Sequence, residues 1–251
     1  MESHRFAAAP ARGRHDGWHR VPLASLDFET TGVDPFHDRV LSYALLDPSG
    51  IEINGLVDPG VPIPPASAEV HGITEAMLAD APHSAEGLAV VVDWVQSLVD
   101  RQVGLVVFNA TYDLTMLRAE ATWLGLTQPD WSRLLVVDPF VVDWGIERGA
   151  LGPLVGVPGV RRQMRPRRLI DVASYYGIPI DRAHDATCDA RAARQVAVEL
   201  GARHVQIGAT TILELMVDQR TWHTERALEW NAYAAKKGRP VDDLGGWPLA
   251  G

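Results

Sequence analysis

The stretch LDFETTG, residues 26–32, places two carboxylates inside an apolar run that ends in a Thr-Thr-Gly turn. Side chains two positions apart on a strand point to the same face, so Asp27 and Glu29 are expected to be neighbours. Burying an unpaired carboxylate is costly, and core strands seldom carry acids. The stretch therefore predicts a strand whose two acids hold a cation, with an acid pair on an exposed strand surface as the alternative.

The composition is that of a globular protein with a sizeable core. The chain has 251 residues, of which 47% are hydrophobic and 22% are charged, enough for one large domain or for one domain with a small appendage. The single cysteine, Cys188, excludes an internal disulfide and a multi-cysteine zinc site. It fits a reducing cytoplasm, which is the expected location. No apolar run is long enough to predict a membrane span.

The net charge of −9 argues against binding nucleic acid through bulk charge, although a local basic track remains compatible with it. Acids that gather to hold metal also count as negative. One basic run, RRQMRPRR at residues 161–168, contains five arginines and no acid. The run predicts either a solvated loop or an edge that contacts phosphate.

The pattern of apolar residues and turn signals predicts an α/β protein. The first strand is expected at 21–29 and a hairpin at 39–60, turning at Asp47–Gly50. Helices are expected at 84–100, at 111–125, and at 167–177 and 185–201, the last two each ending at glycine. Further strands are expected at 103–110 and 133–142, the latter followed by a turn. An early hairpin followed by β-α-β units predicts a mixed sheet with helices packed on it.

Two further acids follow later elements. Asp113 comes directly after the fourth predicted strand, in the first turn of the next helix, where it could instead serve only as a charge favourable to the helix dipole. Asp189 lies five residues after His184, in a helix otherwise rich in Ala, Arg and Gln. His184 could alternatively be a cap or a core histidine, and Asp185 is expected to be an N-cap rather than a ligand.

These groups together suit phosphodiester hydrolysis. Crowded carboxylates repel one another unless cations neutralise them, and oxygen ligands suit Mg²⁺ or Mn²⁺. Two such ions can stabilise the attacking and leaving oxygens of a phosphodiester. A nearby imidazole can take a proton from the attacking water.

The segments LDFETTG, FNATYD (108–113) and HDATCD (184–189) resemble the three motifs of the DEDDh-type 3′–5′ exonucleases. This group contains replicative proofreading subunits, oligoribonuclease and RNase T, and the resemblance extends over roughly residues 22–201. It implies a ribonuclease-H-like α/β fold with a central five-stranded mixed sheet flanked by helices. It also implies two ions of Mg²⁺ or Mn²⁺ and His184 as general base. The implied metal ligands are Asp27, Glu29, Asp113 and Asp189.

The chain is expected to fall into three parts. Residues 1–20 are expected to be a flexible lead-in, residues 21–201 the exonuclease domain, and residues 202–251 a helical extension with a mobile end. The spacing of His184 and Asp189 separates this branch from the one in which a tyrosine stands four residues before the aspartate, a position that Asp185 occupies here.

Other positions resemble parts of the family that contact substrate. Thr30, Thr31 and Gly32 follow the first motif, where backbone N–H groups and hydroxyls hold the terminal nucleotide; a plain turn is the alternative. His71, in the segment HGIT, stands where the family lines the nucleotide site, or it is a structural cap. Asn109 stands where family members often place an asparagine near substrate, or it forms a turn.

The predicted activity is that of a metal-dependent 3′–5′ exonuclease. It would hydrolyse the terminal phosphodiester of single-stranded DNA to release 5′-mononucleotides, in proofreading or repair, with a polymerase or repair protein as partner. One alternative is an RNA 3′–5′ exonuclease that acts on short oligoribonucleotides or tRNA ends. Another is a non-catalytic module of the same fold that docks on nucleic acid or on a polymerase.

Overall fold

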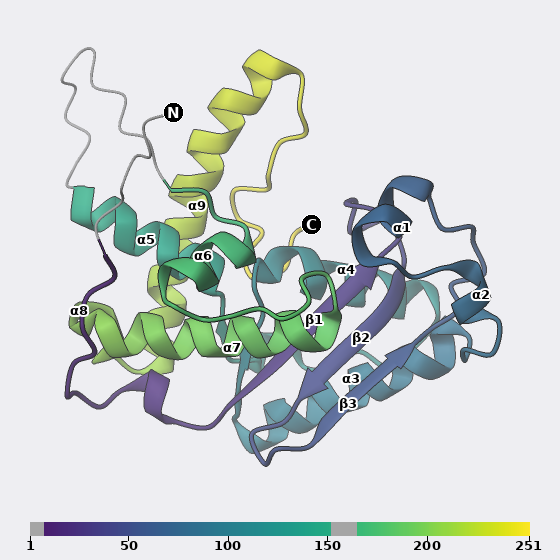
Figure 1. Cartoon of the computed structure of the whole chain (residues 1–251), viewed down its shortest axis with the longest axis horizontal. Coiled ribbons are helices and arrows are strands. Elements are labelled where there is room, and N and C mark those ends of the chain that lie inside the picture. Colours follow the sequence, from purple (N-terminus) through teal and green to yellow (C-terminus); the bar gives the residue numbers. More distant parts are fainter. Residues whose placement is uncertain (1–7, 152–164) are drawn as a thin grey trace.

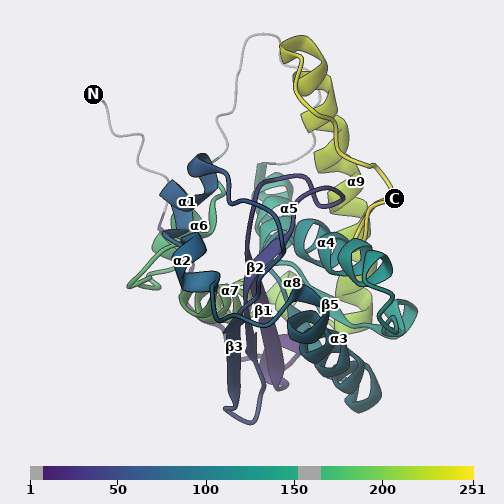
Figure 2. The ribbon, with the colours of Figure 1, turned by 90° about the vertical axis from the view of Figure 1, so that its right-hand side faces the viewer.

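The computed structural model describes residues 8–151 and 165–251 and shows a five-stranded sheet with helices on both faces (Figures 1 and 2). The strands lie in the order β3-β2-β1-β4-β5. The pairs β1–β2 and β2–β3 are antiparallel, whereas β1–β4 and β4–β5 are parallel, which confirms the predicted mixed sheet. Their bounds are β1 Leu23–Thr30, β2 Val40–Leu46, β3 Glu52–Leu56, β4 Gly104–Val106 and β5 Val136–Val137.

Helices α3 and α4 cover one face of the sheet and α7 covers the other (Figure 2). None of the helices within the described residues is both long and apolar enough to cross a membrane. The helices are α1 Pro65–His71, α2 Glu75–Leu78, α3 Ser84–Arg101, α4 Ala110–Trp123, α5 Pro139–Leu151, α6 Leu169–Tyr175, α7 Ala186–Arg203, α8 Val205–Gly208 and α9 Ile212–Lys237. Single 3₁₀ turns occupy Trp18–Arg20 and Trp131–Arg133.

The alternation of β1 decides which face receives the acids. Ala24, Leu26 and Phe28 are buried in the cluster that packs under α3 and α4. Because neighbouring residues of a strand point to opposite faces, Asp27 and Glu29 project from the other face, toward α7. The sheet therefore separates an apolar core from an acidic surface along a single strand.

Helix α7 approaches this acidic face closely because its sheet-facing residues are small. Ala186 and Ala190 are buried against Ala44 and Leu46 of β2. Alanine leaves the helix backbone near the strand, whereas a larger residue would lift it away. Asp189, in the first turn of α7, is thereby brought over β1.

The fifth strand differs from the prediction. Only Val136–Val137 pair with β4, and α5 begins at Pro139, inside the segment that was expected to be strand. Proline favours the first position of a helix. The carboxylate of Asp138 accepts the backbone N–H of Phe140 at 3.0 Å, so this residue caps α5.

The end of α7 also differs. The helix was expected to stop at Gly201, and it continues to Arg203. A Cβ atom at Gly201 would lie 2.4 Å from the Cβ of His19. This glycine therefore permits close packing of the chain near residue 19 and does not end the helix.

Residues near both ends of the described chain pack on the domain, where a flexible lead-in and a mobile end were expected; residues 1–7 of that lead-in lie outside the described residues. The Trp18 side chain is 2% exposed, and its indole N–H donates to the carbonyl of Ile207 at 2.9 Å. Near the other end, Trp247 is 4% exposed and belongs to the cluster under α3 and α4. One large aromatic residue in each segment thus provides the apolar area that docks it. The domain boundary at residue 202 remains a prediction.

Helix α9 completes the hydrogen bonding of β5, the edge strand of the sheet. The Gln219 side chain is fully buried; its amide donates to the carbonyl of Val136 at 3.0 Å and accepts from the N–H of Asp138 at 2.6 Å. A sheet edge left with unpaired polar groups under a helix would be destabilising. The Gln219 side chain therefore pairs backbone groups at the outer edge of β5 that a neighbouring strand would otherwise pair.

Replacing Gln219 with leucine is expected to lower the free energy of unfolding by about 2–4 kcal/mol, because two buried backbone groups are left without partners. Urea unfolding followed by circular dichroism measures this decrease. The control is Arg220→Leu, an exposed position in the same helix, for which a change within about 0.5 kcal/mol is expected. Equal stability of the two variants would contradict the hydrogen-bonding role of Gln219.

Candidate active site

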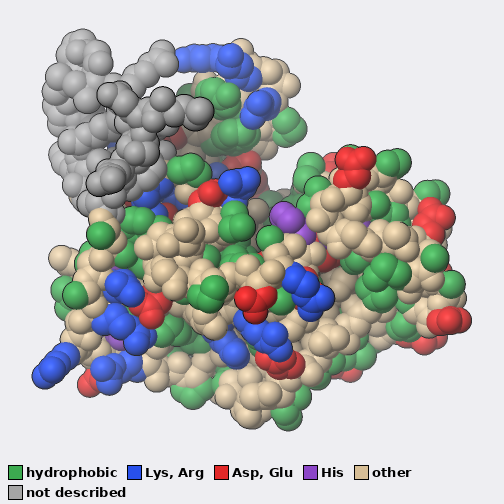
Figure 3. Space-filling model, in the orientation of Figure 1, with side chains coloured by type: hydrophobic (Ala, Val, Ile, Leu, Met, Phe, Trp, Pro, Cys, Tyr) green, Lys and Arg blue, Asp and Glu red, His purple; other side chains and the backbone are tan. Residues whose placement is uncertain are grey.

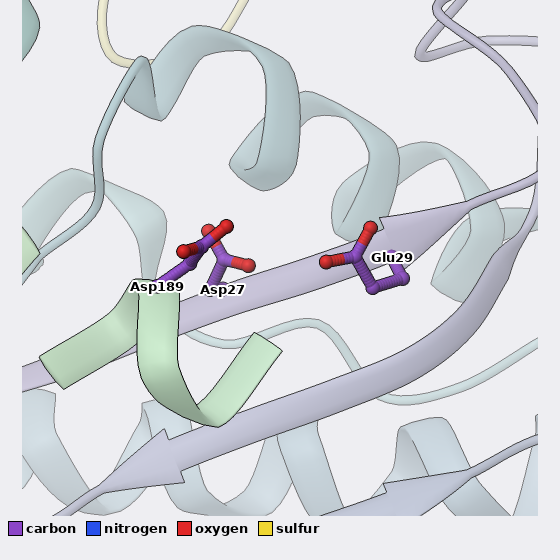
Figure 4. A group of neighbouring side chains, drawn as sticks. All are labelled: Asp27, Glu29 and Asp189. Atoms are coloured by element: carbon purple, nitrogen blue, oxygen red, sulfur yellow. The ribbon is translucent and has the colours of Figure 1, made fainter. Parts of the chain in front are cut away.

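Three carboxylates meet near the carboxyl end of β1 (Figure 4). Asp27 and Glu29 come from the strand, and Asp189 comes from the first turn of α7 above it. One carboxylate oxygen from each residue lies within 4.8 Å of the others. In the figure Asp189 and Asp27 lie side by side, with Glu29 farther along the strand and facing them. Two predicted motifs that are far apart in the sequence thus converge.

The fourth predicted acid, Asp113, lies outside this group of three but lines the same cavity. It is 5% exposed, in the first turn of α4, and it follows β4 as predicted. The cavity has a volume of about 400 Å³ and is bordered by all four acids and by His184. The space-filling view of this face is hollowed between the parts formed by α6 and α1, and a histidine stands at the edge of the hollow (Figure 3).

Burial and mutual repulsion make the acids hard to ionise without a counterion. Burial raises the pKa of Asp27 well above its usual range, and the charges of Asp113 and Asp189 raise it further. Burial raises the pKa of Glu29 to about 7, with Asp189 again adding to the effect. A divalent cation among these oxygens would reverse the balance, because it favours the charged forms.

The hydrogen bonds of Asp189 leave room for such a cation. Its Oδ2 accepts the backbone N–H of His184 at 3.0 Å. Its Oδ1 is buried and has no hydrogen-bond partner within residues 8–151 and 165–251. A buried oxygen without a partner is unfavourable unless an ion or water satisfies it. The group of three offers only oxygen ligands, which suit Mg²⁺ or Mn²⁺.

His184 stands at the mouth of the cavity in an unusual backbone conformation. Its φ is 62°, in the left-handed region that residues other than glycine seldom adopt. The residue is exposed, so it is not a core histidine. The next residue, Asp185, is the N-cap of α7 as predicted: its carboxylate accepts the N–H of Cys188 at 3.1 Å. The contacts of Asp189 and Asp185 thus fix the backbone from which the His184 side chain projects at the cavity.

The turn after β1 uses its own hydroxyls. Thr30 Oγ1 lies 2.7 Å from the carbonyl oxygen of Gly32, to which it donates, and 2.8 Å from the Tyr112 hydroxyl. Thr31 Oγ1 donates to Asp38 at 3.0 Å and accepts the N–H of Arg39 at 2.9 Å. The two threonines, expected to offer hydroxyls to substrate, therefore direct them into the turn.

Tyr112 is a residue of the site that the sequence motifs did not single out. It lines the cavity beside Asp113, and its hydroxyl also donates to the carbonyl of Gly32. It thereby joins the turn after β1 to the first turn of α4. Its place immediately before Asp113, inside the motif FNATYD, was the available signal.

His71 lies on a second cavity that joins the first at Glu29 and His184. This cavity, of about 610 Å³, extends over β2 and β3 toward α2. His71 Nδ1 accepts the N–H of Ile73 at 3.0 Å, which fits the alternative of a structural cap. Its Nε2 is buried and has no hydrogen-bond partner in the described part of the chain.

Asn109 borders the first cavity and also forms a turn. Its φ is 65°, again in the left-handed region, and its side chain is exposed. Asp138 accepts the backbone N–H groups of Asn109 at 2.9 Å and of Ala110 at 3.0 Å. This buried carboxylate fixes the turn from which α4, and therefore Asp113, starts.

Comparison with known proteins agrees with the motifs. A family model described as an exonuclease of the RNase T type matches residues 25–124. The chain is 30% identical over 178 residues to "Uncharacterized exonuclease CP81" of Escherichia phage 186, covering 66% of this chain and 81% of that protein. It is 27% identical over 190 residues to DNA polymerase III subunit epsilon of Treponema pallidum, covering 74% of this chain and 79% of that protein.

Solved structures show the same fold. Exonuclease I of E. coli, in complex with a dT13 oligonucleotide, superposes with a TM-score of 0.58 at 17% identity and covers 74% of this chain. The match spans only 42% of the exonuclease I chain, so the likeness carries the ribonuclease-H-like fold and nothing more. The phage relative, the family model and the three motifs show that the chain belongs to the RNase T-type exonuclease family, the DEDDh-type 3′–5′ exonucleases.

Proposed function

We propose that this exonuclease removes nucleotides one at a time from the 3′ end of single-stranded DNA, releasing 5′-monophosphates. The observation that carries the proposal is the convergence of Asp27, Glu29 and Asp189 in one cavity, with a buried Asp189 oxygen that lacks a partner in the described chain. Such a cluster suits metal-assisted hydrolysis of a phosphodiester better than it suits packing.

The cluster would hold two ions of Mg²⁺ or Mn²⁺, with Asp27, Glu29 and Asp189 as direct ligands and Asp113 assisting. When bound, these ions supply Lewis acidity and neutralise charge around the phosphate. The oxygen-only ligand set supports hard cations rather than zinc, which commonly takes histidine or cysteine ligands. His184 lies at the rim with its ring exposed and is kept for proton transfer.

In the proposed reaction a water molecule attacks the terminal phosphorus while His184 accepts the proton of that water. A bond forms between the water oxygen and phosphorus, and the bond to the 3′-oxygen of the preceding nucleotide breaks. The departing 3′-oxygen takes a proton from solvent and His184 later returns its proton to solvent, so the products are a 5′-monophosphate and a strand with a new 3′-hydroxyl. The hydrogen bond from the His184 backbone N–H to Asp189 keeps the base next to the carboxylates throughout.

DNA is favoured over RNA by the identity of the relatives. Several are subunits or parts of DNA polymerase III, and two solved neighbours hold the DNA oligonucleotides dT13 and dA16. The same relatives support a polymerase or repair protein as partner. An RNA exonuclease and a non-catalytic docking module are the two competing functions.

A substrate assay is expected to give a ladder of shortened products from 5′-labelled single-stranded DNA with Mn²⁺ or Mg²⁺, and a slower ladder from RNA of the same sequence. Chelation by EDTA is expected to stop both. A ladder from RNA alone would show that the substrate is RNA and not DNA. Binding of both strands without cleavage would favour the docking module.

Substitution of the acids and of the histidine is expected to separate metal binding from proton transfer. Asp27→Asn should abolish cleavage and weaken Mn²⁺ binding measured by calorimetry. His184→Ala should lower kcat about 10²–10⁴-fold, the usual contribution of a general base, and leave Mn²⁺ binding intact. The control is Asp185→Asn, which keeps an N-cap and should retain activity. Near-normal kcat in His184→Ala would remove the general-base assignment.

The pH dependence of stability is expected to reveal the carboxylate crowding. The pKa of Glu29 rises on folding from 4.5 to about 7. The stability that protonated Glu29 contributes to the folded protein is therefore fully present below pH 4.5 and is lost as the pH increases through 7. For the metal-free protein this decrease in stability is about 3 kcal/mol.

Urea unfolding without metal at pH 5 and pH 8 measures this effect. Glu29→Gln should be the more stable protein at pH 8, and Mn²⁺ should raise the stability of the wild type at that pH more than at pH 5. Parallel pH profiles for the wild type and Glu29→Gln would show that Glu29 is not strained by its neighbours.

A further inference from the structure

The segment 165–168, the described part of the arginine run, lies at the catalytic cavity. Arg167 and Arg168 border the cavity together with Phe108, Phe140 and the four acids. The remainder of the run, residues 161–164, falls outside the described residues. None of the three motifs includes this segment. The sequence predicted either a solvated loop or an edge that contacts phosphate, and the described arginines of the run differ from one another in their contacts.

Two of these arginines, Arg165 and Arg167, form ion pairs with acids of α5. Asp143, which is fully buried, accepts from Arg165 at 2.7 Å and from Arg167 at 3.0 Å. Glu147, one helical turn later on α5, also binds Arg167 and accepts the backbone N–H of Arg165 at 3.1 Å. Two carboxylates balance two guanidinium groups, so this cluster anchors the segment and brings no net charge to the cavity.

Arg168 differs because its side chain remains open to solvent, with 78% of its surface exposed. Asp171, in the first turn of α6, accepts from Arg168 Nε at 2.8 Å and from Nη2 at 3.0 Å. These contacts use two of the five N–H donors of a guanidinium and fix its plane. Arg168 is therefore an exposed guanidinium that Asp171 orients and that has N–H donors left to offer, on a segment that buried ion pairs hold in place.

Two cavities border the site. They meet at Glu29 and His184. The side toward Arg168 also carries Phe108 and Phe140, whose rings lie 5.8 Å apart edge to face. A cation beside aromatic rings is the arrangement that binds single-stranded nucleic acid, because bases stack on the rings while the cation contacts the backbone.

We propose that Arg168 binds the backbone phosphate that precedes the scissile one, and so makes the enzyme prefer a polynucleotide over a mononucleotide ester. This proposal rests on the proposed function. Bidentate pairing of arginine with phosphate supplies the contact, and Asp171 orients the guanidinium before substrate arrives. The residue positions the strand and takes no part in the bond-breaking step.

The test compares two substrates that share the thymidine 5′-phosphoryl group under attack and differ in the leaving group. One is a 5′-labelled thymidine oligonucleotide; the other is the p-nitrophenyl ester of thymidine 5′-monophosphate, which has no preceding phosphate. Arg168→Gln is expected to raise KM for the oligonucleotide about tenfold, the usual effect of removing one charged hydrogen bond, with kcat little changed. For the ester, kcat/KM should change less than twofold.

The salt dependence provides a readout that a purely structural role would not move. The slope of log(1/KM) against log salt concentration is negative and should become less steep by about 0.7 in Arg168→Gln, because one phosphate of a single strand is no longer neutralised by the protein. Arg168→Lys should restore the slope, because it keeps the charge, and restore KM only in part, because it lacks the guanidinium fork.

The matched control is Arg191→Gln. Arg191 also pairs with a carboxylate through Nε and Nη2, that of Glu52, but it borders neither cavity. It should match the wild type on both substrates. An equal decrease in kcat/KM on both substrates in Arg168→Gln, or no decrease on either, would overturn the role of Arg168. A wild type that cleaves neither substrate would overturn the nuclease proposal, and this one with it.

Discussion

Electrostatic crowding at the carboxyl end of β1 is the constraint on which the rest of the structure depends. Asp27, Glu29, Asp113 and Asp189 reach one cavity from a strand and two helices, although burial and repulsion oppose their ionisation. The fold overcomes that opposition with ordinary packing: small alanines let α7 lie close to the sheet, and apolar residues fill the opposite face of β1. The folded site thus holds carboxylates whose mutual repulsion a bound cation would reduce.

His184 and Asn109, which line the cavity, both have a left-handed backbone conformation, and the same kind of hydrogen bond stabilises each of them. Such a conformation costs ~1–3 kcal/mol for a residue other than glycine. In each case a carboxylate accepts the backbone N–H, Asp189 for His184 and Asp138 for Asn109. A charged acceptor makes the stronger kind of hydrogen bond, so it can offset part of that cost.

Much of the fold and the group of acids followed from local sequence signals. The alternation around Asp27 and Glu29 gave their common face, and the hairpin followed by β-α-β units gave the mixed sheet. Features that depend on a distant partner could not be predicted in this way. Thr30 pairs with Tyr112, the arginine run pairs with acids of α5, and β5 is completed by Gln219. Nothing near any of these residues in sequence indicates its partner.

The Gln219 contact also imposes an order of events on biosynthesis. All three motifs leave the ribosome before residue 219, and yet the β5 edge next to Asp138, which holds the turn before Asp113, is completed only by that side chain. A nascent chain that has just emerged through Asp189 therefore carries all four acids without the side chain that completes β5 beside Asp138. The hydrogen bonds that complete β5 form only after Gln219 of α9 has been synthesised.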